Sequence, residues 1–205
     1  MRFLDYAGHR QNNIICPRCG SHPRQRALCF FLDAEIARLQ AGSAVLHFSA
    51  ERNMTPIFAR RGDLRYVTAD LNLKSAMVRA DATRLPFQTG SFSLIVSSHM
   101  LEHIREDREA VAEFARVLGP GGEAIIMVPT LVDWRSSRTR EFGAPDPRLE
   151  GHWRIYGFDL AERLEAAGLE CRTIGTADFV SDEIAHQCEL MDDAIFVARK
   201  PRTHS

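Results

Sequence analysis

The chain has 205 residues, of which 45% are hydrophobic and 26% are charged. This length and composition suit one soluble globular domain with a substantial core, and they exclude a disordered chain, which would have far fewer apolar residues. The formal net charge of −1 excludes a global field that attracts nucleic acid or an anionic membrane. No apolar run approaches the ~20 residues of a membrane helix, and the N-terminus lacks the apolar centre of a signal peptide, so we expect a cytoplasmic protein without a membrane partner.

The N-terminal segment, residues 1–23, is polar, irregular and relatively basic, and we expect it to be an appendage to a single domain over residues 24–205. Within it, CPRCG has the shape of a zinc knuckle, in which Pro and Gly bend the chain so that the thiolates of Cys16 and Cys19 face one metal. A structural zinc needs four ligands, and few further His or Cys residues lie nearby in the sequence. A zinc site and free buried thiols therefore stay as two hypotheses.

Hydrophobic periodicity predicts alternating helices and strands through the rest of the chain. Apolar residues at spacings of three and four indicate helices, whereas short apolar runs indicate strands buried on both faces. The predicted elements in chain order are a helix over 24–40, a strand over 44–48, a short helix over 54–61, strands over 65–69, 76–80 and 94–96, a helix over 104–118, a strand over 124–128, a helix over 158–167, and closing strands over 169–174 and 194–198.

The stretch from Ala80 to Pro129 is the most informative part of the sequence. It reads as loop, strand, helix, turn and strand, and Gly119-Pro120-Gly121-Gly122 ends the helical pattern with residues that cannot continue a helix. Such a unit is a βαβ crossover of an open α/β sheet. The following residues 131–157 form a long polar stretch with scattered aromatic residues, which in a compact domain is more often a lid or substrate loop than a linker.

Two strings within this region, LPFQTGSFSLIVSSHMLEH and RVLGPGGEAIIMVP, resemble the second half of class I S-adenosylmethionine-dependent methyltransferases, of the type 11-like group that methylates small molecules. The resemblance spans roughly residues 40–200. It implies an α/β, Rossmann-like fold with a seven-stranded, mostly parallel sheet and helices on both faces. It also implies S-adenosyl-L-methionine as the cofactor.

Candidate cofactor residues follow from the rule that ligands of an open parallel sheet lie beyond the carboxyl ends of its strands. Asp70 and Asp81 end two predicted strands, and a carboxylate can only accept hydrogen bonds, as a ribose diol or an adenine amino group requires. The alternative is that both are helix caps or turn residues. The resemblance assigns the ribose to Asp70 and the adenine to Asp81, and it extends the cofactor-binding set to the residues Phe48, Ser49, Ala50, Glu51, Leu71, Ala82 and Ser97.

The loop after the first strand departs from the family pattern. Methyltransferases carry a glycine-rich E-x-G-x-G-x-G there, which lets the backbone close around the cofactor, whereas this chain has HFSAERN without glycine. A branch of the family is similar to this chain in HFSAE, in an upstream CPRCGSHPRQR and in a downstream RIYGFDLAERL. Two interpretations compete, a loop of small residues that still admits the cofactor and a site that no longer binds it.

Methyl transfer from a sulfonium needs orientation and exclusion of water, and sometimes a base. His99 and His103 flank the end of the fourth predicted strand and are the catalytic candidates, with Glu102 between them. His152 and Tyr156, in the lid-like segment, are candidates for contact with the substrate. Each of these residues could instead have a purely structural role.

The leading functional hypothesis is a methyltransferase acting on a small-molecule or sugar-like acceptor. A nicotinamide dehydrogenase would need G-x-G-x-x-G after the first strand, which the sequence lacks. A non-catalytic binding protein that kept the fold, and an RNA methyltransferase that uses the CPRCG segment, remain alternatives. A nucleic-acid partner is disfavoured by the balanced charge.

Overall fold

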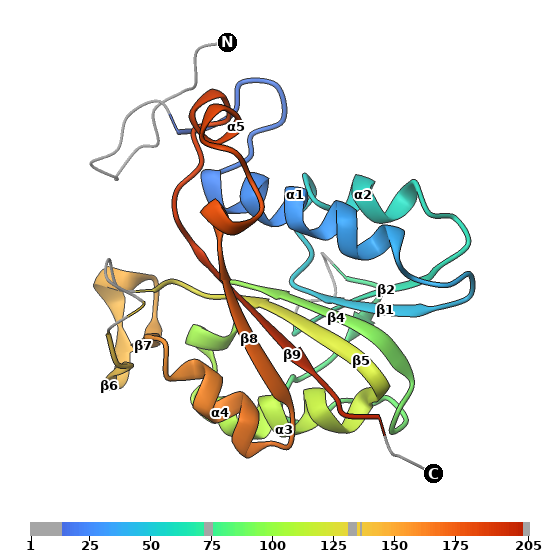
Figure 1. Cartoon of the computed structure of the whole chain (residues 1–205). Helices are drawn as coiled ribbons and strands as arrows, with labels where there is room; N and C mark the ends of the chain where they lie inside the picture. Colours follow the sequence, from blue (N-terminus) through green and yellow to red (C-terminus); the bar gives the residue numbers. More distant parts are fainter. Residues whose placement is uncertain (1–13, 72–75, 131–134, 136, 203–205) are drawn as a thin grey trace. The chain divides into compact units, whose positions relative to one another are not determined.

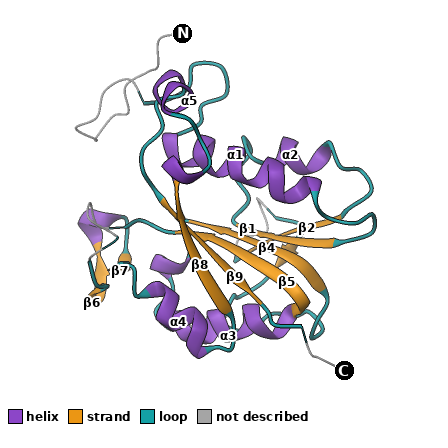
Figure 2. Cartoon of the chain, in the orientation of Figure 1, coloured by secondary structure: helices purple, strands orange, loops and turns teal. Residues whose placement is uncertain are grey.

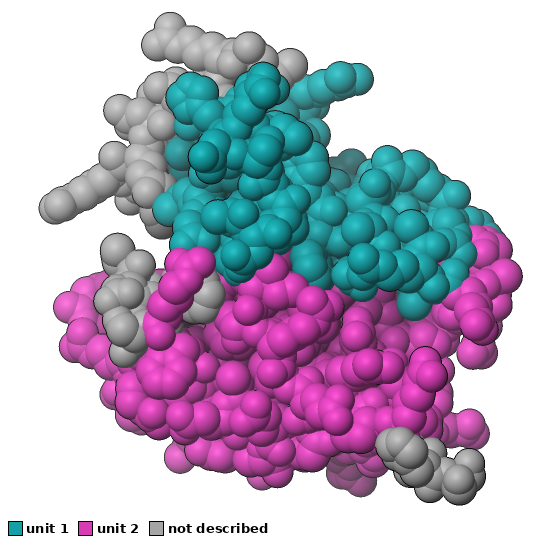
Figure 3. All heavy atoms as spheres, in the orientation of Figure 1, with its two compact units in different colours: residues 1–39, 51–62, 175–193 teal, residues 40–50, 63–174, 194–205 magenta. Residues whose placement is uncertain are grey.

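The computed structural model describes residues 14–71, 76–130, 135 and 137–202. The chain divides into two compact units (Figure 3). Unit 1 comprises residues 1–39, 51–62 and 175–193, and unit 2 comprises residues 40–50, 63–174 and 194–205. The predicted boundary between an appendage and a domain at residues 23 and 24 stays a prediction.

Unit 2 contains a seven-stranded sheet with the strand order β3-β2-β1-β4-β5-β9-β8 (Figures 1 and 2). The pairs β1 with β2, β1 with β4, β2 with β3 and β4 with β5 are parallel, and β9 is antiparallel to β5. The predicted α/β class with a mostly parallel seven-stranded sheet is thereby confirmed. The bounds are β1 Ala44–Phe48, β2 Arg65–Asp70, β3 Val78–Arg79, β4 Phe92–Ser98, β5 Leu118–Met127, β8 Glu170–Gly175 and β9 Ala194–Arg199.

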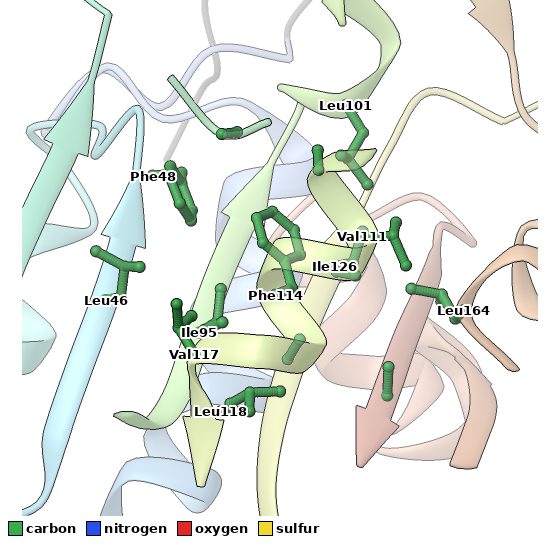
Figure 4. Packing of buried hydrophobic residues seen from close by; sticks show 14 of the residues in the cluster. Leu46, Phe48, Ile95, Leu101, Val111, Phe114, Val117, Leu118, Ile126 and Leu164 are labelled. Atoms are coloured by element: carbon green, nitrogen blue, oxygen red, sulfur yellow. The ribbon is translucent and has the colours of Figure 1, made fainter. Parts of the chain in front are cut away.

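Two helices of unit 2, α3 (Asp107–Val117) and α4 (Leu160–Ala166), pack against one face of this sheet (Figure 1). Phe114 of α3 is fully buried, and its ring stacks on that of Phe48 with 5.2 Å between centroids. Figure 4 shows this ring surrounded by aliphatic side chains of the sheet and the helices. The hydrophobic core therefore reaches Phe48, the last residue of β1, which holds the carboxyl end of that strand in place.

Unit 1 consists of α1 (Pro23–Ala37), α2 (Thr55–Ala59) and α5 (Asp182–Gln187), with their connecting segments. Phe31 and Phe179 pack edge to face with 5.4 Å between centroids. Arg61 donates from its two Nη atoms to the carbonyls of Ile36 and Leu39 at 2.8 and 2.9 Å, which ties the segment after α2 to the C-terminal end of α1. None of the helices in the described residues is long and apolar enough to cross a bilayer.

The segment predicted as a lid, residues 131–157, contains a two-stranded antiparallel sheet of β6 (Arg140–Asp146) and β7 (His152–Ile155). Residues 131–134 and 136 lie outside the described residues. The sequence pattern predicted no strands here, because neither β6 nor β7 alternates regularly between buried and exposed residues. β6 has no fully buried residue. The role of this hairpin as a lid stays a prediction.

Other element bounds also differ from those predicted. The Gly-Pro-Gly-Gly segment was expected to be a turn, but it lies inside β5, where Gly121 and Gly122 exchange backbone hydrogen bonds with Lys200 at 2.9 Å. A Cβ at Gly122 would meet the Phe92 carbonyl oxygen at 3.1 Å, so glycine permits this close approach of strands. Single-turn 3₁₀ segments span Leu101–His103 (η1), Pro147–Leu149 (η2) and Thr176–Asp178 (η3), and none of these was predicted.

Candidate functional site

The carboxyl ends of β1, β2 and β4 lie side by side in unit 2. Phe48, at the end of β1, pairs with Ala69 on β2 and with Ser97 on β4. The backbone N–H of Ser49 donates to the Ala69 carbonyl at 3.0 Å, and that of Ala80 donates to the Asp70 carbonyl at 2.9 Å. Several of the strand-end residues chosen from the sequence are thus brought to one edge of the sheet, where open parallel sheets bind ligands.

Two residues just beyond these strands have a left-handed backbone. Ser49 follows β1 with a φ of 46°, and His99 follows β4 with a φ of 49°. Positive φ is uncommon for residues other than glycine and carries strain that proteins tend to keep at functional sites. Ser49 therefore adopts a conformation that glycine takes without strain, and this conformation lets a loop without glycine turn away from β1.

The two candidate acids have different surroundings. Asp70 is half-buried as the last residue of β2, and the neighbouring Leu71 is 60% exposed. Asp81 is exposed and closes a turn, because its Oδ1 accepts from the backbone N–H and the hydroxyl of Thr83 at 2.9 and 2.8 Å. Both bonds use one oxygen, so Oδ2 can accept from a ligand. Ala82 beside it is buried.

Ser97 and Ser98 end β4 next to Phe48. Their side chains are buried, with 0% and 5% exposure, and within the described part of the chain neither hydroxyl has a hydrogen-bond partner. A buried hydroxyl left without a partner costs free energy, about 1–3 kcal/mol. These two hydroxyls are therefore polar groups that a ligand at the carboxyl edge can satisfy.

Glu51, which was predicted to bind the cofactor, belongs to unit 1. Its Oε1 lies 3.7 Å from the guanidinium of Arg24 on α1. Asn53 donates to the Oε1 of Gln25 at 2.5 Å, and that oxygen also accepts from the backbone N–H of His22 at 2.8 Å. The upstream CPRCGSHPRQR motif and the second half of HFSAERN therefore hold each other in place.

Arg26 of the same motif binds four backbone carbonyls of unit 1. It donates to the carbonyls of Ile14 at 3.1 Å, Cys188 at 2.7 Å and Glu189 at 3.1 Å, and also to that of Ser21. Five donors in a rigid fork suit arginine to this task. A structural role accounts for this arginine without a phosphate ligand.

Cys16 and Cys19 lie in a tight turn, in which the N–H of Gly20 donates to the Cys16 carbonyl at 2.8 Å. Burial opposes ionisation of the Cys16 thiol, but backbone hydrogen bonds from Arg18 and Cys19 outweigh it and lower the pKa of this thiol. Among the described residues, no His, Cys, Asp or Glu places a third ligand atom close enough to these two thiols to form a metal-binding group. Zinc at Cys16 and Cys19 stays a prediction.

The two catalytic candidates differ in their contacts. Nδ1 of His99 lies 3.5 Å from Oε1 of Glu102, whose side chain is 0% exposed. His103 instead faces His152 of β7, with 4.7 Å between ring centroids in an edge-to-face arrangement. Burial lowers the pKa of both His103 and His152, and Glu150 partly opposes this in each case. Both imidazoles are therefore predominantly neutral at neutral pH.

Tyr156, the second substrate candidate, is fully buried. Its hydroxyl donates to Oδ2 of Asp107 at 2.8 Å, and burial, reinforced by Asp107, raises the pKa of this phenol. The guanidinium of Arg163 also reaches Asp107 at 2.6 Å, and Arg154 and Arg163 both bind Glu141 at 2.9 and 2.6 Å. Direct contact of Tyr156 with an acceptor stays a prediction; what the geometry shows is a buried anchor.

The sequence alone did not predict this network, although three of its residues belong to the RIYGFDLAERL motif. Arg154, Tyr156 and Arg163 of the motif all converge near Asp107 at the start of α3. Gly157 of the motif lies against the backbone of Ser137, and a Cβ at this position would collide with the Ser137 carbonyl oxygen. The motif therefore fixes the β6–β7 hairpin to the rest of unit 2.

Comparison with known proteins adds a family relationship. A family described as "Methyltransferase domain" matches residues 34–126. A probable chloroplastic tocopherol O-methyltransferase of Oryza sativa subsp. japonica is 35% identical over 74 residues, which is 36% of this chain and 20% of that protein. A demethylmenaquinone methyltransferase of Clavibacter sepedonicus is 45% identical over 49 residues, 24% of this chain and 20% of that protein. The chain spans about a fifth of the length of these curated relatives.

Solved structures share the fold. The 1,6-didemethyltoxoflavin-N1-methyltransferase of Burkholderia thailandensis, solved with 1,6-didemethyltoxoflavin and S-adenosylhomocysteine, superposes with a TM-score of 0.61. The match has 19% sequence identity and covers 86% of this chain and 78% of that chain. At this identity the likeness establishes the fold.

Proposed function

We propose that this chain, whose residues 34–126 match a methyltransferase domain, transfers a methyl group from S-adenosyl-L-methionine to a small-molecule acceptor. The observation that carries the proposal is the carboxyl edge of the sheet, where left-handed Ser49 follows β1 and the acid Asp70 ends the adjacent strand β2. The named small-molecule methyltransferases among its relatives support this acceptor class.

The residues at this edge fit the proposed cofactor. Asp70 would accept from the ribose diol, Oδ2 of Asp81 from the adenine amino group, and the exposed Leu71 would cover the adenine ring. The buried hydroxyl of Ser97 would meet polar atoms of the amino-acid end, and Ser49 and Ala50 would let the backbone approach. The sulfonium supplies an already activated methyl group, so the protein's task is to orient it and to exclude water.

His99 is the proposed base where the acceptor must lose a proton. Glu102 lies next to its Nδ1, and a carboxylate in this position orients an imidazole and stabilises its protonated form. His103, whose ring packs on His152, is the weaker candidate. We expect that His99→Gln lowers turnover much more than cofactor affinity.

Titration of S-adenosylhomocysteine by calorimetry tests the cofactor site. Asp70→Asn should weaken binding at least tenfold, which corresponds to about 1.4 kcal/mol. The matched control is Asp182→Asn, an exposed acid on α5 that should leave the affinity unchanged. Absence of binding to the unmodified protein at millimolar concentration would refute the proposal and favour a non-catalytic protein.

A second pair of variants tests the loop. Ser49→Gly should preserve or improve binding, since glycine adopts a positive φ without strain, whereas Ser49→Val should weaken it because a β-branched residue strongly disfavours that conformation. Radiolabelled methyl transfer should then be measured with phenolic, quinol and sugar acceptors in parallel with RNA. Transfer to RNA alone would contradict the small-molecule class.

A further inference from the structure

A cluster of metal-ligating side chains lies in unit 2, apart from the residues proposed to hold the cofactor. One ligand atom from each of Glu102, His103 and His152 lies within 4.8 Å of the other two. Two imidazoles and a carboxylate are a set that proteins use for divalent transition metals, in catalytic zinc sites and in non-haem iron sites. We propose that Glu102, His103 and His152 bind one divalent transition-metal ion.

The spacing of the three ligand atoms is close to what a metal requires. Metal–ligand bonds of about 2.1 Å place two ligand atoms about 3.4 Å apart in a tetrahedral site and up to about 4.2 Å apart across an octahedral one. The separations in this cluster, at most 4.8 Å, lie close to these values.

The different exposure of the three ligands suits a cation. Glu102 is fully buried, His152 is half-buried and His103 is exposed, so an ion can enter from the side of His103 and meet a shielded carboxylate. Among the described residues, none forms a hydrogen bond with the buried Nδ1 of His152. A metal ion would satisfy such a nitrogen, and imidazoles bind metals in their neutral form.

Arg154 fixes β7, which carries His152, beside η1, which carries Glu102 and His103. It donates from Nη1 to the carbonyls of Leu101 and Ile104 and from Nη2 to that of Arg105 at 2.8 Å, and these carbonyls flank the Glu102–His103 pair. His152 and Arg154 are two residues apart on β7, so their side chains leave the strand on the same face. The buried arginine thereby fixes the strand that carries His152 beside η1.

Three protein ligands leave coordination positions for a ligand oxygen, as in catalytic zinc sites. The cation would thus favour an acceptor with an oxygen that can coordinate a metal, such as a hydroxyl or a carboxylate. Only this last role rests on the proposed methyltransferase function; metal binding rests on the three side chains alone.

Direct titration of Zn²⁺ into chelator-treated protein, by competition with a chromophoric chelator, tests the site. We expect one equivalent at this site, with Mg²⁺ binding far more weakly because imidazoles favour transition metals. His152→Phe keeps an aromatic ring against His103 but removes the ligand, and Glu102→Gln removes the charge. Each should weaken Zn²⁺ binding at least tenfold, since losing even an outer-shell partner typically costs about 10–100-fold.

Two controls separate this site from other metal binding. His186→Gln removes an exposed histidine on α5 and should leave the affinity unchanged. Co²⁺ in place of Zn²⁺ reports on ligand type, because ligation by Cys16 and Cys19 would add a sulfur-to-cobalt charge-transfer band that nitrogen and oxygen ligands lack. Unchanged circular dichroism and melting temperature will show that the His152 and Glu102 variants are folded.

The outcomes are separable from those of the cofactor experiment. Equal Zn²⁺ affinity in the unmodified protein and in folded His152→Phe, or no binding to the unmodified protein, would overturn the metal site. A cobalt spectrum with only sulfur ligation would also overturn it. Tight metal binding without S-adenosylhomocysteine binding would instead leave the site intact and refute the proposed methyltransferase function.

Discussion

His47 gives the protein a predictable sensitivity to acid. It is fully buried on β1, and its Nδ1 lies 2.8 Å from the hydroxyl of Tyr66 on β2. Burial lowers the pKa of this imidazole from 6.5 to about 4 in the folded protein. As the pH falls below about 6.5, the unfolded chain therefore binds a proton at His47. The folded protein binds this proton only when the pH approaches about 4.

The size of the effect follows from the shift. The free energy of unfolding has its full value, as far as His47 is concerned, above pH 6.5, and it decreases as the pH falls toward about 4. Between about pH 7.5 and about pH 5, proton uptake by the unfolded chain costs about 2 kcal/mol of the free energy of unfolding. Such a loss is a large part of the about 5–15 kcal/mol of a typical domain.

Urea unfolding followed by circular dichroism at the two pH values measures this loss. His47→Gln keeps a hydrogen-bonding side chain toward Tyr66 but cannot take up a proton, so its stability should fall by about 2 kcal/mol less than that of the unmodified protein over the same interval. If His47→Gln retains the full pH dependence, the burial argument is refuted.

Three further substitutions test the packing of unit 2 by urea unfolding at neutral pH. Phe114→Ala should cost about 3–5 kcal/mol because it empties a fully buried site in the core, and a loss below ~1 kcal/mol would show that the ring is not central. Gly157→Ala should cost about 1–3 kcal/mol because its methyl group collides with the Ser137 carbonyl, and an unchanged midpoint would contradict that approach. Tyr156→Phe should cost about 1–3 kcal/mol by removing the hydrogen bond to Asp107, and a neutral result would mean that this phenol does not anchor the carboxylate.

The fold was predictable where one local signal decided it. The strand over 44–48 matches β1 residue for residue, because all five side chains are buried and a run of this length is too short for a helix but typical of a buried strand. The third strand was placed over 76–80, but β3 has only Val78 and Arg79, since pairing with β2 rather than local sequence sets its length.

The candidate site was predictable at strand ends and not beyond them. Asp70 could be chosen because a strand pattern ends at it. The partnership of His103 with His152 had no sequence signal, because the two are 49 positions apart and meet only once the β6–β7 hairpin is anchored. The left-handed backbone of Ser49 was likewise hidden, since serine carries no conformational signature of the kind that glycine does.

The position of β9 within the sheet has a consequence for biosynthesis. Residues 194–199 insert between β5 and β8, so every earlier strand is made before the sheet can be closed. Until then the backbone N–H and C=O groups of Ile125 to Met127 on that side have no strand to pair with, and such an edge is prone to associate with other chains. A ribosome stalled shortly before residue 194 should therefore display a nascent chain that chaperones bind, and release should follow the emergence of this strand.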